Sequence, residues 1–316
     1  MSWLILISGA RAVNQASCQT AVDHKQFNGL PHRLAVKTFM TVMVPLRAGF
    51  AAAVIVSSFM PQARAQDSSP WVKDGHSAVR LLAGSRSGAV LLGGIAFQLQ
   101  PGWHTYWRNP GDSGVPPRFD FGKSENIEAV TILWPAPIKF EDGAGGTSLG
   151  YQKQVVLPLR IVAKNPDKPV TLRAEINYAV CEKLCIPVEA SAELAFTSVA
   201  STEDSALSAA LDTVPKPATI GDPNPLTIRD VKRDGKNGVL VDVAAPDSAE
   251  VNLFVEGPTP EWALPVPKLV EHGPPGVKRF AFDLDGLPPG ANPDGAALKL
   301  TLVGGERAYE FNVNLD

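Results

Sequence analysis

The sequence contains few of the side chains that bind metals. It has three cysteines, Cys18, Cys181 and Cys185, and only five histidines among 316 residues. A structural zinc site takes four cysteine or histidine ligands, and the sequence brings no such set together. We therefore exclude a structural zinc site, and we expect neither a metal nor another cofactor.

The sequence also lacks a segment that is long and apolar enough to span a membrane. The most apolar run, Ala48–Met60, has 13 residues, whereas a transmembrane helix needs about 20. A basic residue precedes this run and Ala63-Arg64-Ala65 follows it, which is the pattern of a secretory signal. We expect residues 1–65 to be a cleaved signal peptide with an annotation excess at its start, because translation begins near Met40 or Met43. The mature protein is then periplasmic and soluble.

Basic residues are not in excess. The formal net charge is −3, and removing residues 1–65 takes away six Lys or Arg and one Asp, which leaves 23 basic and 31 acidic residues and a charge of −8. An acidic protein is a poor partner for nucleic acid or anionic lipid. The glycine-rich stretch Gly143–Gly146 lacks the strand–loop–helix context of a phosphate-binding loop.

After residue 65, apolar and polar residues alternate with a period of two, and proline, glycine and asparagine interrupt the pattern. Helical periodicity is almost missing, so the fold class is all-β, with two immunoglobulin-like β-sandwich domains. The first domain is predicted over residues 66–200. Its predicted strands are Ala78–Leu82, Ala89–Gln100, Ile127–Leu133, Gln154–Val162, Val170–Cys181 and Cys185–Phe196, and its long predicted loops are Asn109–Pro117 and Glu141–Gly150.

A proline-rich linker with one short helix, Thr202–Thr213, is predicted over residues 201–224. The second β-sandwich follows over residues 225–316. Its predicted strands are Leu226–Val231, Val239–Val243, Val251–Val255, Ala263–Val266, Val277–Leu284, Ala297–Val303 and Tyr309–Leu315.

The clearest local pattern surrounds the two remaining cysteines. Alternation is continuous through Val170–Val180 and again through Ile186–Phe196, which predicts an antiparallel hairpin whose turn is Glu182-Lys183-Leu184. In this hairpin Cys181 and Cys185 face each other at the last pair of the ladder. Both lie on the polar phase of their strands, so we predict that neither is a core residue.

Opposed residues in such a ladder lie ~4.5–5.5 Å apart by Cα, which is within the range that a disulfide needs. A bridge that closes so short a loop stabilises a fold very little. Reactivity is therefore the preferred explanation for Cys181 and Cys185, and the predicted function is electron transfer by thiol–disulfide exchange.

Two other interpretations of the cysteine pair remain open. Two thiolates also suit Cu(I), so the chain is alternatively a periplasmic copper-binding or copper-tolerance protein. The second alternative is a structural β protein with an inert disulfide.

The run Tyr178-Ala-Val-Cys181-Glu-Lys-Leu-Cys185-Ile-Pro187 resembles the redox motif of the amino-terminal periplasmic domain of the DsbD family of thiol:disulfide interchange proteins. It is most similar to the periplasmic region of ScsB-type (suppressor of copper sensitivity) proteins. The stretches Pro101–Gly114, Trp134–Pro137 and Tyr151–Leu159 extend the resemblance over roughly residues 76–197, and it continues through Leu253–Pro258.

The resemblance implies an immunoglobulin-like sandwich in which Cys181 and Cys185 are the catalytic pair. It implies a membrane electron-transfer protein or a thioredoxin-like domain as donor, and a periplasmic oxidoreductase or other disulfide protein as recipient. By analogy, Cys185 forms the mixed disulfide with a partner. In DsbD-type domains a cap loop with an aromatic residue shields the cysteines, and the matching stretch here begins at Phe140 and is otherwise rich in glycine.

Further residues are candidates for lining the site or docking a partner. They are Tyr178, Glu182 and Lys183 on the hairpin, the aromatic cluster Trp103, His104 and Trp107 (which also contains Tyr106), Asp112 in the following loop, and Phe140. Aromatic residues anchor protein interfaces, although a strand end packed on the sandwich is an equally simple role for the cluster.

Overall fold

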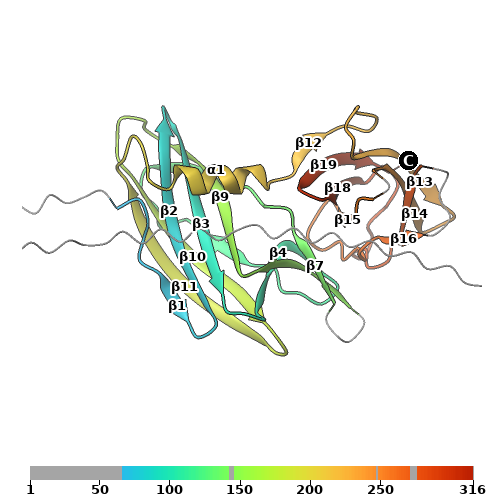
Figure 1. Ribbon diagram of the computed structural model, residues 1–316, viewed down its shortest axis with the longest axis horizontal. Helices are drawn as coiled ribbons and strands as arrows, with labels where there is room; N and C mark the ends of the chain where they lie inside the picture. Colours follow the sequence, from blue (N-terminus) through green and yellow to red (C-terminus); the bar gives the residue numbers. More distant parts are fainter. Residues whose placement is uncertain (1–65, 142–145, 247, 271–275, 316) are drawn as a thin grey trace, which may run out of the picture. The chain divides into compact units, whose positions relative to one another are not determined.

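The computed structural model describes residues 66–141, 146–246, 248–270 and 276–315 (Figure 1). These residues lie in one compact unit, Pro61–Asp316. The predicted signal peptide, residues 1–65, lies outside the described residues. No helix within the described part of the chain is long and apolar enough to cross a membrane.

The predicted all-β immunoglobulin-like class is confirmed, because the described residues form two pairs of sheets with a core between each pair. In the first pair, one sheet has the order β1-β2-β3-β9-β6 and the other has the order β11-β10-β4-β8-β7, with β5 paired to β10. The strands are β1 (Val72–Asp74), β2 (Ser77–Ser87), β3 (Val90–Leu99), β4 (His104–Gly111), β5 (Arg118–Asp120), β6 (Ile127–Ile132), β7 (Ile138–Glu141), β8 (Thr147–Gln152), β9 (Gln154–Ala163), β10 (Val170–Cys181) and β11 (Cys185–Phe196).

Alternation along β10 explains how the first sandwich forms its core. The even-numbered side chains from Val170 to Val180 are buried, whereas Asn177 on the opposite phase is exposed. Leu81 of β2 and Ile95 of β3 belong to the same apolar cluster from the other sheet. The burial of these chains removes apolar area from water, which is the main stabilising contribution to such a sandwich.

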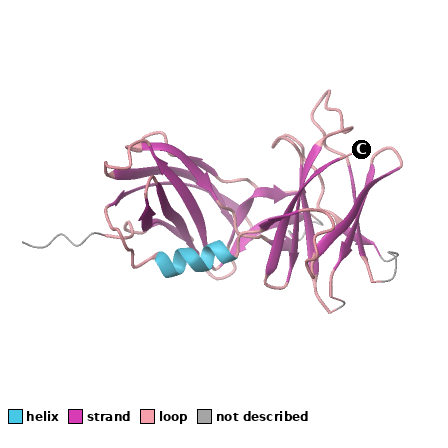
Figure 2. Cartoon of the chain, turned by 90° about the horizontal axis from the view of Figure 1, so that it is seen from above, coloured by secondary structure: helices cyan, strands magenta, loops and turns pink. Residues whose placement is uncertain are grey.

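The second pair of sheets has the orders β12-β19-β18-β15 and β13-β14-β17-β16. Its strands are β12 (Lys216–Ala218), β13 (Thr227–Asp234), β14 (Gly238–Ala244), β15 (Val251–Glu256), β16 (Lys268–Val270), β17 (Lys278–Asp283), β18 (Ala297–Gly304) and β19 (Arg307–Asn314). The α-helix α1 (Asp204–Asp212) stands out among the strands in Figure 2, and its Leu207 is fully buried against Leu82 and Ala96.

Several strands differ from the sequence-based predictions. The strand predicted at Ala263–Val266 is wrong, and the edge strand β16 forms instead after Pro265 and Pro267, because proline has no N–H for a ladder. The predicted linker, residues 201–224, contains β12, which pairs in parallel with β19. Part of each predicted long loop is also strand, since β4 continues to Gly111 and β8 begins at Thr147.

An ion pair joins two adjacent strands of the second sandwich. Arg279 on β17 donates from Nε to Oδ1 of Asp242 over 2.6 Å and from Nη2 to Oδ2 over 2.7 Å. These hydrogen bonds lower the pKa of Asp242 below its ordinary value. Because the carboxyl is more acidic in the folded than in the unfolded chain, the pair stabilises the fold above the unfolded pKa of about 3.9, and this stabilisation is lost as the pH falls through the folded value.

We predict that Asp242→Asn lowers the free energy of unfolding by about 1–3 kcal/mol at pH 7, since it removes a hydrogen-bonded charge that is little exposed. The deficit relative to the wild type should be the same at pH 6 and should shrink below about pH 4, where the wild-type carboxyl also becomes neutral. Urea unfolding at each pH measures it. A deficit that stays constant down to pH 2 contradicts the assignment.

Candidate disulfide site

The cysteines close the longest hairpin of the first sandwich. Strands β10 and β11 pair without a register shift from Val170↔Phe196 to Cys181↔Cys185. At this last pair the two cysteines form a disulfide, with their Cα atoms 4.2 Å apart. The backbone ladder therefore places the sulfurs together, as the alternation in the sequence predicts.

The two cysteines differ in their exposure. The structure contradicts the prediction that neither is a core residue, because Cys181 is only 3% exposed and packs with Tyr106 and Ala179. Cys185 is exposed, as predicted. Cys181 is buried because β10 is an inner strand at this point, with His104 of β4 opposite it on one side and Cys185 of β11 on the other. One sulfur is thus accessible to another protein and its partner is shielded.

Tyr106 brings a hydroxyl group to the disulfide. Its O–H donates to Cys181 Sγ over 2.9 Å, and the oxygen lies 3.2 Å from Cys185 Sγ. Strand β4 fixes this placement, because Thr105 lies opposite Val180 and donates from Oγ1 to the carbonyl of Ala179 over 2.9 Å. A hydroxyl donor stabilises a thiolate much more than a thiol, so Tyr106 favours the opening of the bridge with Cys181 as the leaving group.

Two glycines allow Tyr106 to reach this position. At Gly150 on β8, a Cβ atom would lie 1.9 Å from the carbonyl oxygen of Thr105 and 2.9 Å from Tyr106 Cα. At Gly114, a Cβ atom would lie 2.6 Å from Cδ1 of the Tyr106 ring. Only glycine fits such close approaches without displacing its neighbour, so both positions help to define where the tyrosine lies.

His104 and Phe140 continue the aromatic row away from the sulfurs. The His104 ring packs edge-to-face on Tyr106 at 5.4 Å and stacks on Phe140 at 4.8 Å. Burial lowers the pKa of His104 below its ordinary value, so the imidazole is neutral near pH 7. Phe140 lies on β7, opposite Ser148 of β8. The aromatic residue that the sequence places at the edge of the cap region therefore contacts the row that leads to the disulfide.

The turn between the cysteines is an exposed surface. Glu182, Lys183 and Leu184 are all exposed, and the Leu184 side chain reaches 78%. Ile186, directly after Cys185, is also exposed. An apolar side chain on each side of the accessible sulfur offers contact area to an approaching protein.

Three of the predicted site residues have packing roles. Trp107 is fully buried in the core of the first sandwich, and Trp103 stacks on His76 at 3.8 Å. Tyr178 is buried, with its hydroxyl 2.8 Å from Ser77 Oγ. These three side chains therefore pack within the first sandwich.

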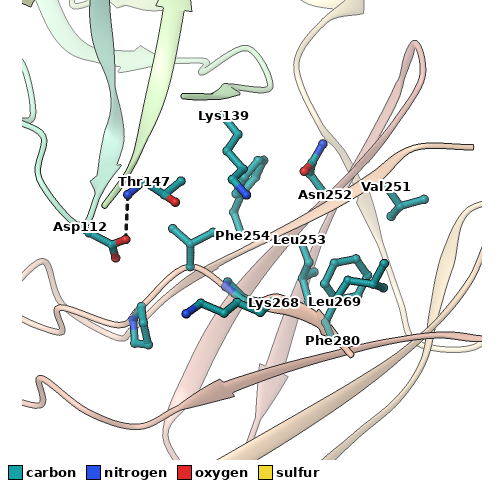
Figure 3. Close-up of a pocket in the computed structure, with 13 residues that line it drawn as sticks. Asp112, Lys139, Thr147, Val251, Asn252, Leu253, Phe254, Lys268, Leu269 and Phe280 are labelled. Carbon is teal, nitrogen blue, oxygen red and sulfur yellow. Dashed lines mark hydrogen bonds between the residues drawn. The ribbon is translucent and has the colours of Figure 1, made fainter. Parts of the chain in front are cut away.

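Asp112 lies beside the start of β8 and lines a cavity, instead of the disulfide. Its carboxylate accepts a hydrogen bond from the backbone N–H of Thr147 over 3.0 Å. Figure 3 shows both residues at one side of a cavity of about 260 Å³, with Leu253 and Phe254 of β15 among the residues that line the other side. The loop carboxylate thus fixes the start of β8 beside the second sandwich.

Tyr106 is the residue that sequence reasoning missed as part of the site. Tyr106 belongs to the aromatic cluster of residues 103–107. The cluster alone does not indicate which of its rings faces the hairpin. The signal in the sequence is the spacing of two residues between His104 and Tyr106, which places both side chains on the same face of a strand.

Comparison with known proteins identifies a matching family and a solved structure of similar fold. Residues 78–197 match the family described as thiol:disulfide interchange protein DsbD, N-terminal. The crystal structure of the N-terminal periplasmic domain of ScsB from Proteus mirabilis has 22% sequence identity and a TM-score of 0.64, and the match covers 79% of this chain and 99% of that one. This likeness shows a shared fold.

Two other solved structures are much less similar. The GAE domain of yeast GGA1 has 10% identity and a TM-score of 0.23, with 40% of this chain and 97% of that chain covered. A conserved domain protein from Bacillus anthracis has 10% identity and a TM-score of 0.26, with coverages of 78% and 79%. No curated protein gave a significant sequence match.

We predict that Tyr106→Phe slows the reduction of the Cys181–Cys185 bridge by dithiothreitol about tenfold, because the leaving thiolate loses a hydrogen bond of about 1.5 kcal/mol. Stopped-flow measurement of the reduction rate at pH 7 tests this. Tyr151→Phe is the matched control, since it removes a buried hydroxyl that donates to the carbonyl of Pro135 over 2.8 Å. Equal rates for Tyr106→Phe and the control contradict the assigned role.

We also predict that Gly150→Ala destabilises the fold by about 2 kcal/mol or more, because the methyl group would overlap the backbone of β4. Thermal unfolding measures the loss. A variant that is as stable as the wild type would mean that the close approach of β4 and β8 is not required.

Proposed function

Since residues 78–197 match the DsbD amino-terminal family, we propose that the chain is a periplasmic thiol–disulfide exchange protein that relays electrons through Cys181 and Cys185. The observation that carries this proposal is the asymmetry of the bridge. Cys185 is exposed at the end of the hairpin, while Cys181 is buried beside the Tyr106 hydroxyl. An inert structural bridge needs neither an exposed sulfur nor a donor aimed at the other one.

The first step is attack by the thiolate of an electron donor on Cys185 Sγ. A new sulfur–sulfur bond forms between the donor and Cys185 while the Cys181–Cys185 bond breaks, and Cys181 leaves as a thiolate. Tyr106, 2.9 Å from Cys181 Sγ, stabilises that charge through its hydroxyl.

The second step releases the donor. Its other thiolate attacks its own sulfur in the mixed disulfide, so that the donor leaves as a disulfide and Cys185 leaves as a thiolate. Two electrons have then passed to the chain, which holds both cysteines reduced. The same steps in reverse order pass the two electrons to an oxidised recipient.

The chemistry of the exchange defines the partners. The donor needs two thiols on one protein, as a thioredoxin-like domain or a membrane electron-transfer protein has, and the recipient is a disulfide-containing periplasmic protein. The donor and the recipient must both reach Cys185 Sγ. Leu184 and Ile186 provide apolar contact on each side of this sulfur. The ring of Phe140 stacks on His104, whose ring in turn packs on Tyr106 beside the sulfurs.

Trapping with single-cysteine variants tests the proposal. Cys181→Ser leaves the exposed Cys185 as the free thiol, and Cys185→Ser leaves the buried Cys181. Each variant is mixed with thioredoxin that lacks its second active-site cysteine and has its first activated as a mixed disulfide with a chromogenic thiol. We expect the Cys181→Ser variant to form the protein–protein disulfide at least about tenfold faster, because exposure controls thiol reactivity.

A second measurement follows the reduction of the wild-type chain by reduced thioredoxin that has both active-site cysteines. The proposal requires rapid reduction, followed by counting of two free thiols. A bridge that thioredoxin leaves intact while dithiothreitol opens it contradicts the carrier function, and preferential trapping of Cys181 contradicts the order of steps.

A further inference from the structure

The strand that carries Tyr106 loses its regular pairing with β8 directly after this residue. Tyr106 pairs with Gly150 of β8, and the next pair in the ladder is Gly111↔Ser148. Residues 107–110 of β4 therefore stand opposite a single residue of β8. A bulge of this size removes the regular ladder that would otherwise fix the backbone after Tyr106.

The second sandwich holds the bulge in place of the ladder. Arg108 donates from Nε to Glu256 Oε1 over 2.9 Å and from Nη2 to Glu256 Oε2 over 2.7 Å, and Nη2 also donates to Glu310 over 2.6 Å. Asn109 donates from Nδ2 to the carbonyl of Val255 over 2.8 Å. Two consecutive residues of β4 are thus bound to β15, and the first of them also to β19.

This contact is well enclosed. The side chains of Arg108, Glu256 and Glu310 are between 19% and 22% exposed. Burial lowers the pKa of Arg108, but the hydrogen bonds and charges of the two glutamates raise it above its ordinary value. The guanidinium carbon of Arg108 lies 4.6 Å from the centre of the fully buried Trp107 ring, and the Phe254 ring of β15 lies 6.0 Å from it. A two-pronged Arg–carboxylate pair beside a packed ring fixes both the distance and the orientation of β4 relative to β15.

From this geometry we propose that Arg108 and Glu256 are positioning residues for the disulfide, and that the second sandwich sets the place of the Tyr106 hydroxyl through them. The inference rests on the proposed exchange function and adds a role for the second sandwich in it. Tyr106 and Arg108 are two residues apart on β4, so a shift of the bulge moves the tyrosine backbone. A shift of about 0.5 Å is enough to weaken a hydrogen bond of this length.

The test replaces Glu256, a residue of the second sandwich that is bonded to Arg108 through both carboxylate oxygens. In Glu256→Gln the amide keeps the volume of the carboxylate but loses its charge and one of its two acceptors. We expect dithiothreitol to reduce the bridge about threefold more slowly at pH 7, which corresponds to part of the effect of one hydrogen bond to a charged group. Glu310→Gln weakens the one bond that Arg108 donates to Glu310, and also the ion pair of Glu310 with Lys299, and should give a smaller effect in the same direction.

The control is Asp242→Asn. Asp242 accepts the same two-pronged bond from Arg279, with side chains 11% and 19% exposed, but within the sheet of β14 and β17. The Asp242→Asn variant destabilises the second sandwich but leaves its bonds to β4 unchanged. The reduction rate of its disulfide should therefore equal that of the wild type. Unfolding midpoints of all variants establish that each is folded during the measurement.

The decisive comparison uses the Tyr106→Phe background. If Glu256 acts through the hydroxyl, Tyr106→Phe/Glu256→Gln is reduced no more slowly than Tyr106→Phe alone. A threefold loss that persists in this background, an equal loss in Asp242→Asn, or no loss in Glu256→Gln overturns the inference. These outcomes leave the proposed function intact, since that function fails only if thioredoxin does not reduce the wild-type bridge.

Discussion

The pairing of Cys181 between two strands is the constraint on which the site depends. Its backbone pairs with Cys185 of β11 on one side and with His104 of β4 on the other. The first pairing brings the sulfurs together, and the second buries one of them beside a tyrosine that β4 supplies. A hairpin alone would leave both sulfurs open to solvent. The third strand creates the difference between a buried and an exposed cysteine.

The same strand joins the site to the rest of the molecule. Strand β4 carries His104 and Tyr106 at the disulfide and Arg108 and Asn109 at the second sandwich. Its bulge is stabilised by charged and amide hydrogen bonds instead of by a ladder. Those bonds come from β15 and β19. The second sandwich thus contributes to the geometry of the site, although both cysteines belong to the first sandwich.

The sequence predicted what local pattern determines and missed what distant strands determine. Alternation gave the bounds of β10 and β11 and the facing of Cys181 and Cys185, because a hairpin is a local structure. The burial of Cys181 could not be predicted, because it depends on β4, which is some 75 residues away in the chain. The first part of β8 falls in the predicted loop Glu141–Gly150, because the glycines of that stretch signal turns locally, whereas Gly150 allows a close approach to β4.

Strand β11, which carries Cys185, is the outer strand of its sheet. An edge strand offers a row of free backbone groups to which a foreign strand can add. Two residues after Cys185, that row is interrupted at Pro187, which has no N–H to offer, and the exposed Glu189 follows. In the proposed exchange, a partner would therefore meet side chains and a sulfur at this edge in place of a template for strand addition.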